Sequence, residues 1–188
     1  MVAFLKHLIF ATSNKEKLRE FIEILKTEVV QVDLELQEPQ AIEVEDVVRE
    51  KAMQAYRILK KPVLVEDTGL FVHSWGGFPG ALVKLLIKSA GLGGFLDMMR
   101  SAVDRGATAK TTIAFYDGHT VHIFSGSVDG TIAKEIKGRS GFGWDPIFIP
   151  AGYEKSFAEL AGSIKNEISM RSIALNKLKK YMNENNGD

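Results

Sequence analysis

Apolar residues recur along the first sixty positions with two different spacings. Residues 8–11 form a short apolar run that predicts a strand. The next apolar positions lie at offsets 0, 3, 4 and 7 counted from Leu18, which predicts one face of a helix. Residues 28–36 alternate and predict a second strand, whereas residues 44–59 predict a second helix that ends before Pro62.

Strand and helix patterns stay mixed in the rest of the chain. Further strands are predicted at residues 63–65, 110–116, 119–128, 131–136 and 147–149. Helices are predicted at residues 81–88 and 95–100, and a C-terminal helix begins near Ser169. The Asp117-Gly118 pair between two strands is typical of a hairpin. Because strands and helices neither alternate strictly nor segregate, the predicted fold class is α/β with a mixed β-sheet.

The composition is that of an ordinary globular protein, and 188 residues suit a single domain spanning 1–188. Lysine plus arginine equals aspartate plus glutamate at 24 each, so no global basic field favours nucleic acid or an anionic membrane as a partner. Neither a membrane-spanning apolar stretch nor a signal peptide is recognisable. The absence of cysteine excludes disulfides and cysteine nucleophiles and fits a cytoplasmic location.

The first candidate for chemistry is the polar segment 12–17, which follows the first predicted strand. Thr12, Ser13 and Asn14 suit the cap of a helix, and the free backbone N–H groups of a helix start bind phosphate. Lys17 in the first turn could direct its ammonium at the same anion. The alternative is a plain capped surface helix with exposed lysines.

The second candidate is Glu66-Asp67, which emerges directly from the apolar strand 63–65. Two neighbouring carboxylates repel each other unless a cation neutralises them, and Mg²⁺ is bound through one or two carboxylates together with phosphate oxygens. The alternative is a turn at Asp67-Thr68-Gly69 with an Asp side-chain cap.

The third candidate is the glycine-rich segment 138–146. Its glycines, among them Gly143, allow a ligand to approach closely, and Phe142 and Trp144 offer flat faces for a base. Asp145 adds an acceptor for a purine N–H. The alternative is a β-turn whose aromatic residues pack in the core.

The fourth candidate is the segment 165–171. Lys165 is predicted just before a helix, with Ser169 and Arg171 at its start. Arg171 could donate to an oxygen of a base or a phosphate. The alternative is that Ser169 caps the helix and Arg171 is a solvated surface residue.

Taken together and in order, these segments resemble the inosine triphosphate pyrophosphatase family over about residues 8–178. The motifs that carry the resemblance are Thr-Ser-Asn-x-x-Lys (12–17), Val-Glu-Asp-Thr-Gly-Leu (65–70), Gly-Gly-Phe-Pro-Gly (76–80) and Gly-Phe-Gly-Trp-Asp-Pro-Ile-Phe (141–148). The resemblance implies a long mixed sheet flanked by helices, with a nucleotide cleft between two lobes, and usually a homodimer. It also implies Mg²⁺-dependent hydrolysis of ITP, dITP and XTP to the monophosphate and pyrophosphate.

The resemblance also assigns roles to individual residues. Asp67 would be catalytic and would activate water, and the implied metal ligands are Glu38, Glu66 and Asp67. Of these, the match of Glu38 requires a one-residue gap. The implied substrate-binding residues are Thr12, Ser13, Asn14, Lys17, Lys51, Thr68, Phe142, Gly143, Trp144, Asp145, Lys165, Ser169 and Arg171.

One departure from the family pattern concerns base selection. The family usually has Ser-His-Arg where this chain has Ser169-Met170-Arg171. A thioether cannot donate a hydrogen bond to a purine 6-oxo group as histidine can, and losing such a donor costs ~1–3 kcal/mol. We therefore expect weakened specificity rather than lost activity. Leu82 also replaces a frequent aromatic residue, which has no explanation in the sequence.

Two rival functions remain open at this point. One is a related pyrophosphatase of the septum-inhibitor type acting on pyrimidine nucleotides, against which the segment 142–146 argues. The other is an inert nucleotide- or RNA-binding module, against which the retained acids and lysines and the zero net charge argue.

Overall fold

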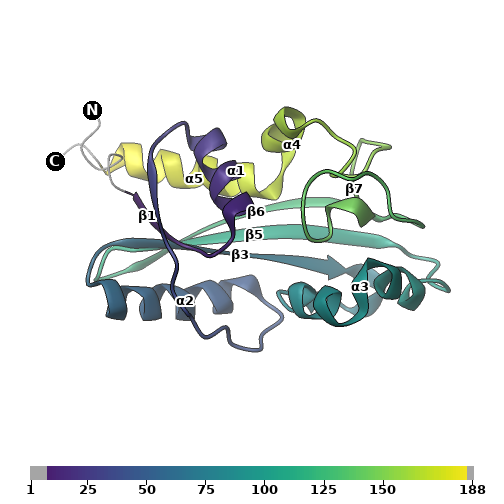
Figure 1. The fold of residues 1–188 in the computed structure, drawn as a ribbon, viewed down its shortest axis with the longest axis horizontal. Coiled ribbons are helices and arrows are strands. Elements are labelled where there is room, and N and C mark those ends of the chain that lie inside the picture. The colour runs from purple at the N-terminus through teal and green to yellow at the C-terminus, as the bar shows by residue number, and fades with distance from the viewer. Residues whose placement is uncertain (1–7, 186–188) are drawn as a thin grey trace.

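The computed structural model describes residues 8–185 as a mixed sheet between helices (Figure 1). The strand order is β2-β1-β3-β5-β6-β7, and β4 pairs with β3 beside this path. The strands are β1 (Leu8–Ala11), β2 (Val29–Val32), β3 (Val63–Val72), β4 (Pro79–Gly80), β5 (Gly106–Tyr116), β6 (Val121–Ile132) and β7 (Phe148–Pro150). β1 is parallel to β2 and β3, whereas all the other pairs are antiparallel. The prediction of a mixed α/β fold is confirmed.

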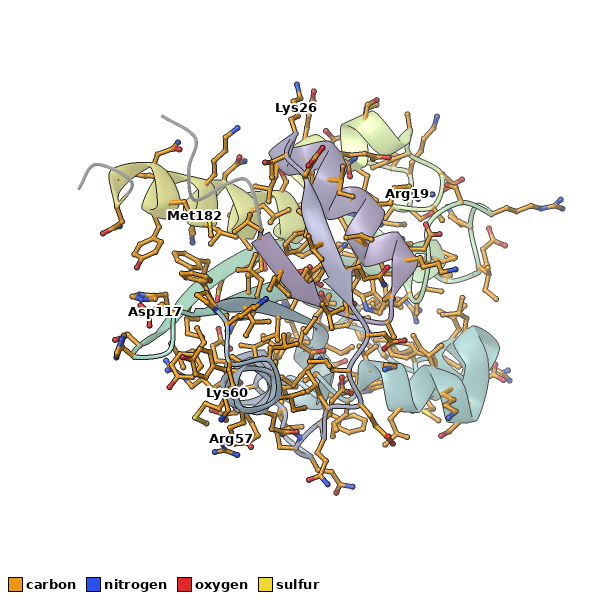
Figure 2. All side chains as sticks on the ribbon, turned by 60° about the vertical axis from the view of Figure 1, so that its left-hand side comes forward. Arg19, Lys26, Arg57, Lys60, Asp117 and Met182 are labelled. Carbon is orange, nitrogen blue, oxygen red and sulfur yellow. The ribbon has the colours of Figure 1, made fainter. Side chains whose placement is uncertain are left out.

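Helices cover both faces of this sheet (Figure 1). The α-helices are α1 (Lys15–Leu25), α2 (Val44–Leu59), α3 (Val83–Met98), α4 (Gly162–Ile168) and α5 (Met170–Glu184), and two short 3₁₀ turns are η2 (His73–Trp75) and η3 (Asp145–Ile147). Apolar residues of α1 and α5 pack with Leu64 and Ile113 on one face, and those of α2 pack with Val65 and Ala114 on the other. Figure 2 looks along α2 and shows side chains filling the space between this helix and the strands. No described helix is long and apolar enough to cross a membrane.

Several predicted boundaries were wrong. The strand predicted at 28–36 is only β2, and the one predicted at 131–136 stops at Ile132. The helices predicted at 81–88 and 95–100 both lie in α3, which breaks at Gly91 because its backbone takes a positive φ of 69°. The predicted hairpin is confirmed, with Asp117 accepting hydrogen bonds from the backbone N–H groups of His119 and Thr120 at 2.7 Å.

The most consequential difference concerns β3, which continues to Val72 instead of ending at Val65. The alternative of a turn at Asp67-Thr68-Gly69 is wrong, because Asp67 pairs with Thr112 in the register of β3 and β5. On its other side, β3 pairs with β1 at Leu64 and with β4 only from Leu70 onwards. Residues 66–68 therefore lie where no described strand covers this edge of β3.

Candidate active site

The turn from β1 into α1 is built around Asn14. The Asn14 Oδ1 accepts hydrogen bonds from the N–H groups of Glu16 and Lys17, both at 3.0 Å, and the Thr12 Oγ1 accepts from the Asn14 N–H at 3.1 Å. The helix cap of the alternative interpretation is thus present, but Lys17 is not the exposed lysine that this alternative expects. The Lys17 ammonium lies 3.2 Å from a carboxylate oxygen of Glu66, and its side chain is only 16% exposed.

Glu66 and Asp67 point to opposite faces of the sheet, because consecutive side chains alternate along a strand. Glu66 faces α5, where it meets Arg171, and Asp67 faces α2, where it meets Lys51. The two adjacent carboxylates are therefore held by different partners.

Glu66 is fully buried and fully paired. The Arg171 Nε and Nη2 donate to its two oxygens at 2.8 Å each, and the Thr68 hydroxyl donates at 3.2 Å. Burial alone would raise the pKa of Glu66, but the charges of Arg171 and Lys17 lower it to about 2. Glu66 is therefore an anion under all ordinary conditions.

Asp67 and Glu38 share one lysine. The Lys51 Nζ lies 2.8 Å from a Glu38 oxygen and 3.8 Å from a carboxylate oxygen of Asp67. Burial raises the pKa of Asp67, and the negative charges of Glu38 and Glu66 add to the rise. The charges of Lys17 and Lys51 act in the opposite direction but do not cancel it. Burial would also raise the pKa of Glu38, but Lys51 holds it below its usual value. The two carboxylates of this corner thus form ion pairs with one lysine, while Lys17 and Lys84 act on them from farther away.

The segment 142–146 forms the other end of the site. The Asp145 carboxylate accepts from the Phe142 N–H at 2.8 Å and pairs with Lys165 at 2.6 Å. Lys165 lies 4.8 Å from the centre of the Phe142 ring, and the Arg171 guanidinium lies 5.5 Å from it. Burial raises the pKa of Asp145, although the charge of Lys165 and the hydrogen bonds from Lys165 and Phe142 favour the ionised form. Trp144 is 7% exposed and packs against Phe148, so the alternative of a core anchor holds for it in part.

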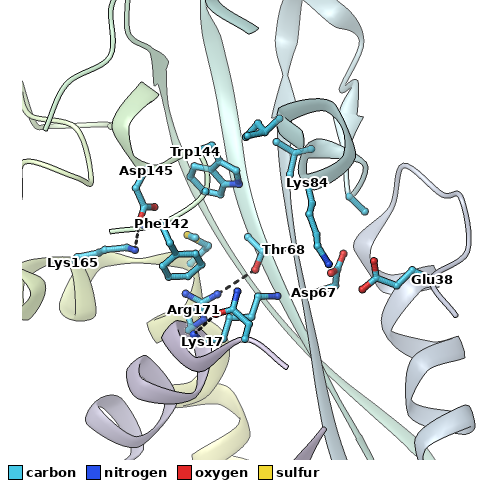
Figure 3. Close-up of a pocket in the computed structure, with 16 residues that line it drawn as sticks. Lys17, Glu38, Asp67, Thr68, Lys84, Phe142, Trp144, Asp145, Lys165 and Arg171 are labelled. Atoms are coloured by element: carbon cyan, nitrogen blue, oxygen red, sulfur yellow. Dashed lines mark hydrogen bonds and ion pairs between the residues drawn. The ribbon is translucent and has the colours of Figure 1, made fainter. Parts of the chain in front are cut away.

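These segments enclose one cavity of about 280 Å³ (Figure 3). Figure 3 shows Phe142, Trp144 and Lys165 on one side and Glu38, Asp67 and Lys84 on the opposite side. The residues predicted for the site that line this cavity are Asn14, Lys17, Glu38, Asp67, Thr68, Phe142, Gly143, Trp144, Asp145, Lys165 and Arg171. The cavity therefore joins an aromatic wall, a set of cations and a pair of acids.

Comparison with known proteins shows the family of this chain. The model of the Ham1 family matches residues 8–181. The chain belongs to the Ham1 family. It is 40% identical to the dITP/XTP pyrophosphatase of Thermococcus kodakarensis over 181 residues, covering 95% of this chain and 98% of the relative. It is also 40% identical to the inosine triphosphate pyrophosphatase of Yarrowia lipolytica, covering 94% and 96%. The solved Ham1 protein of Staphylococcus aureus superposes with a TM-score of 0.83 at 27% identity, covering 95% and 99%.

Five predicted residues of this Ham1 chain do not line the cavity: Thr12, Ser13, Lys51, Glu66 and Ser169. Ser169 caps α5 by accepting from the Ser172 N–H at 3.2 Å, as the alternative for it held. Lys165 precedes α5 as predicted, but it lies in a further short helix, α4, that was not predicted. The alternative of a solvated Arg171 is wrong, because this residue is only 1% exposed.

Sequence reasoning missed Glu20 on α1. Glu20 is 4% exposed and lies 2.9 Å from the Lys165 ammonium, and its second oxygen pairs with Arg171. The sequence held one signal, since Glu20 follows Lys17 by one helical turn and borders the buried Phe21. With Glu20 included, charges of alternating sign run through the interior in the order Asp145, Lys165, Glu20, Arg171, Glu66 and Lys17.

Sequence reasoning also missed the contribution of α3. Lys84, in the first turn of α3, lines the cavity beside the acids, and Met170 lines it from α5. The available signal for Lys84 was a lone cation in an otherwise apolar helix start directly after the Gly-Gly-Phe-Pro-Gly motif.

Proposed function

We propose that this chain hydrolyses non-standard purine nucleoside triphosphates, namely ITP, dITP and XTP, to the monophosphate and pyrophosphate. Relatives that carry the names dITP/XTP pyrophosphatase and inosine triphosphate pyrophosphatase match nearly its whole length. The observation that carries the proposal is the single cavity that joins the ring of Phe142 to the ammonium of Lys17 and the carboxylates of Glu38 and Asp67.

The reaction we propose is attack of water on the α-phosphorus with pyrophosphate as the leaving group. Asp67, which lines the cavity, accepts the proton of the attacking water. Lys17 and Lys51 stabilise the charge that develops on the phosphate oxygens. Asn14 and Lys17, which line the cavity, bind the triphosphate through their side chains, because the N–H groups of Glu16 and Lys17 already donate to the Asn14 Oδ1. Thr68 lines this phosphate end, whereas Thr12 and Ser13 support it from the turn before α1, where the Thr12 hydroxyl accepts from the Asn14 N–H.

The acids at this end suit a divalent cation. No group of three metal-binding side chains exists among residues 8–185, but Mg²⁺ needs only one or two carboxylates besides substrate oxygens. Glu38 and Asp67 supply two such carboxylates around one lysine, and a cation would relieve their repulsion. Mg²⁺, when bound, would polarise the phosphates and neutralise their charge. Glu66 remains a candidate ligand, although Arg171, Lys17 and Thr68 already engage its oxygens.

The opposite end would select the base. Phe142 offers a face for stacking, Trp144 supports it, and Gly143 between them leaves room for the base. Lys165 and Arg171 supply donors that suit a 6-oxo group, and Asp145 supplies an acceptor for a purine N–H. Ser169 positions Arg171 by capping the helix that carries it. A 6-amino group facing the same donors would leave a buried polar mismatch.

The test is release of pyrophosphate from ITP, XTP, GTP, ATP, UTP and CTP, with and without Mg²⁺. We expect Mg²⁺-dependent turnover with the highest kcat/KM for ITP and XTP. Equal kcat/KM for ITP, XTP, GTP and ATP would refute a role in cleansing the nucleotide pool. Preference for UTP or CTP would favour the pyrimidine-specific rival, and tight ITP binding without turnover would favour an inert binding module.

We further propose that the chain forms a homodimer in the cytoplasm. Its ligand is a small-molecule nucleotide, and it binds neither nucleic acid nor a membrane. Its substrates belong to the cytoplasmic nucleotide pool, and its net charge is zero. Exposed apolar side chains outside the cavity support the dimer, because Met98 and Phe78 are 53% and 41% exposed. Light scattering should give twice the chain mass, and a monomer at micromolar concentration would overturn this proposal.

A further inference from the structure

A second groove begins where the cavity ends. Its volume is about 290 Å³, and Glu38, Asp67, Ala81 and Lys84 line both spaces. Lys88 lines only the second groove. The two spaces thus meet at the acids, and neither Phe142 nor Lys165 lines the second groove.

The lysines of this groove differ from the cations of the cavity. Lys17, Lys51, Lys165 and Arg171 each form an ion pair with a carboxylate. Within residues 8–185, no carboxylate pairs with Lys84 or Lys88, and both side chains are exposed. Because they lie four residues apart on α3, their ammonium groups share one side of the helix.

An exit for pyrophosphate must meet two conditions. The product carries several negative charges, so it leaves most readily past cations that are not already paired. It must also leave without displacing the nucleoside monophosphate, whose base occupies the end at Phe142 and Lys165. The second groove meets both conditions, since it starts at the acids and is lined by Lys84 and Lys88.

We propose that the second groove is the route by which pyrophosphate leaves, with Lys88 as the residue that binds its outer phosphate. The inference rests on the proposed function, because it presupposes pyrophosphate as the product. It assigns Lys88 to product binding and not to base recognition. Lys84, which lines both spaces, would contact the same product as it passes from the cavity into the groove.

The test measures product inhibition of ITP hydrolysis in the full chain. In Lys88→Gln, we expect the inhibition constant for pyrophosphate to rise about three- to tenfold, as losing one partly solvated charge contact does. Inhibition by inosine monophosphate should stay within about twofold because that product lies at the other end. Lys88→Glu should weaken inhibition by pyrophosphate further, and Lys88→Arg should restore inhibition to the wild-type level. The matched control is Lys179→Gln on the exposed side of α5, which should match the wild type.

The outcomes separate this inference from the proposed function. Wild-type turnover of ITP combined with equal pyrophosphate inhibition in Lys88→Gln, Lys88→Glu and the wild type would overturn the exit route alone. Equal weakening of inhibition by pyrophosphate and by inosine monophosphate would also overturn the exit route, because Lys88 would then act on the whole site. A wild-type chain that releases no pyrophosphate would overturn the proposed function, and the exit route with it.

Discussion

Charged residues in and behind the cavity wall form two regions that are built differently. In the inner region, Glu20, Glu66, Lys165 and Arg171 are at most 4% exposed, and each has at least two charged partners. In the outer region, Glu38 and Asp67 share Lys51, and the side chain of Glu38 is 43% exposed. The inner charges are buried and fully paired, whereas the outer carboxylates share one ion-pair partner and are partly exposed to water.

This difference suggests that the inner charges hold the fold together and that the outer carboxylates take part in the reaction. A buried ion pair contributes little net stability when complete, but breaking it leaves a buried charge that costs several kcal/mol. The inner charges therefore fix the relative positions of α1, α5 and β3. The outer carboxylates can gain or lose a proton and can bind water or a cation without leaving such a buried charge. Glu66 and Asp67, adjacent on one strand, belong to these two different regions.

The largest expected effect is on activity and comes from Asp67→Asn. Removing the proposed base should lower kcat for ITP by about 10²- to 10⁴-fold. Stability should not fall, because burial raises the pKa of Asp67 and its charge therefore opposes folding at neutral pH. Steady-state kinetics and thermal unfolding of the same sample measure both effects. A nearly active Asp67→Asn variant would remove Asp67 from the chemical step.

The reciprocal change is Glu66→Gln, which should act mainly on stability. Losing the Glu66 charge leaves Arg171 with Glu20 as its carboxylate partner and Lys17 with none among the described residues, and should lower the free energy of unfolding by about 3–5 kcal/mol. Denaturant unfolding measures this loss, and Asp67→Asn is the matched control from the next position on the strand. Equal stability of the two variants would abolish the distinction between inner and outer regions.

The stability of the wild type and of Glu66→Gln should also depend differently on pH in the acid range. The pKa of Glu66 is about 2 in the folded protein against 4.5 unfolded, so its contribution is complete above pH 4.5 and is lost as the pH falls towards 2. Stability of the wild type should therefore fall more steeply than that of Glu66→Gln over this window. Asp117, whose pKa is also lowered to about 2, contributes equally to both and cancels in the comparison. Parallel unfolding curves across this window would contradict the assignment.

Sequence alone located both regions but could not separate them. The apolar run before Glu66-Asp67 marks a strand correctly, yet Asp-Thr-Gly has the composition of a turn, and only pairing with β5 extends the strand through it. That extension sends the two carboxylates to opposite faces. Glu20 escaped notice because its partner Lys165 lies 145 positions away, and an acid on a helix normally indicates a solvated face.

A smaller effect should follow from Phe142→Ala at the base end. Stacking on an aromatic ring contributes ~1–3 kcal/mol per base, so KM for ITP should rise about five- to 150-fold with a smaller change in kcat. Lys165 and Arg171 also lose the ring that they flank, but both keep their carboxylate partners. Trp144→Phe is a useful comparison, since Trp144 is mostly core and should affect stability more than KM. An unchanged KM in Phe142→Ala would place the base elsewhere in the cavity.

The smallest expected effect, and the one most specific to this chain, concerns Met170. Met170 is 2% exposed and lines the cavity next to Arg171, so its thioether borders the base end without offering a donor. Met170→His supplies that donor and should raise the ratio of kcat/KM for ITP over ATP by about tenfold, within the range expected for one buried hydrogen bond. Met170→Leu keeps the apolar volume and should leave the ratio unchanged. If histidine and leucine gave the same ratio, discrimination at this end would rest on Lys165 and Arg171 alone, and the inner charges would select the base as well as hold the fold.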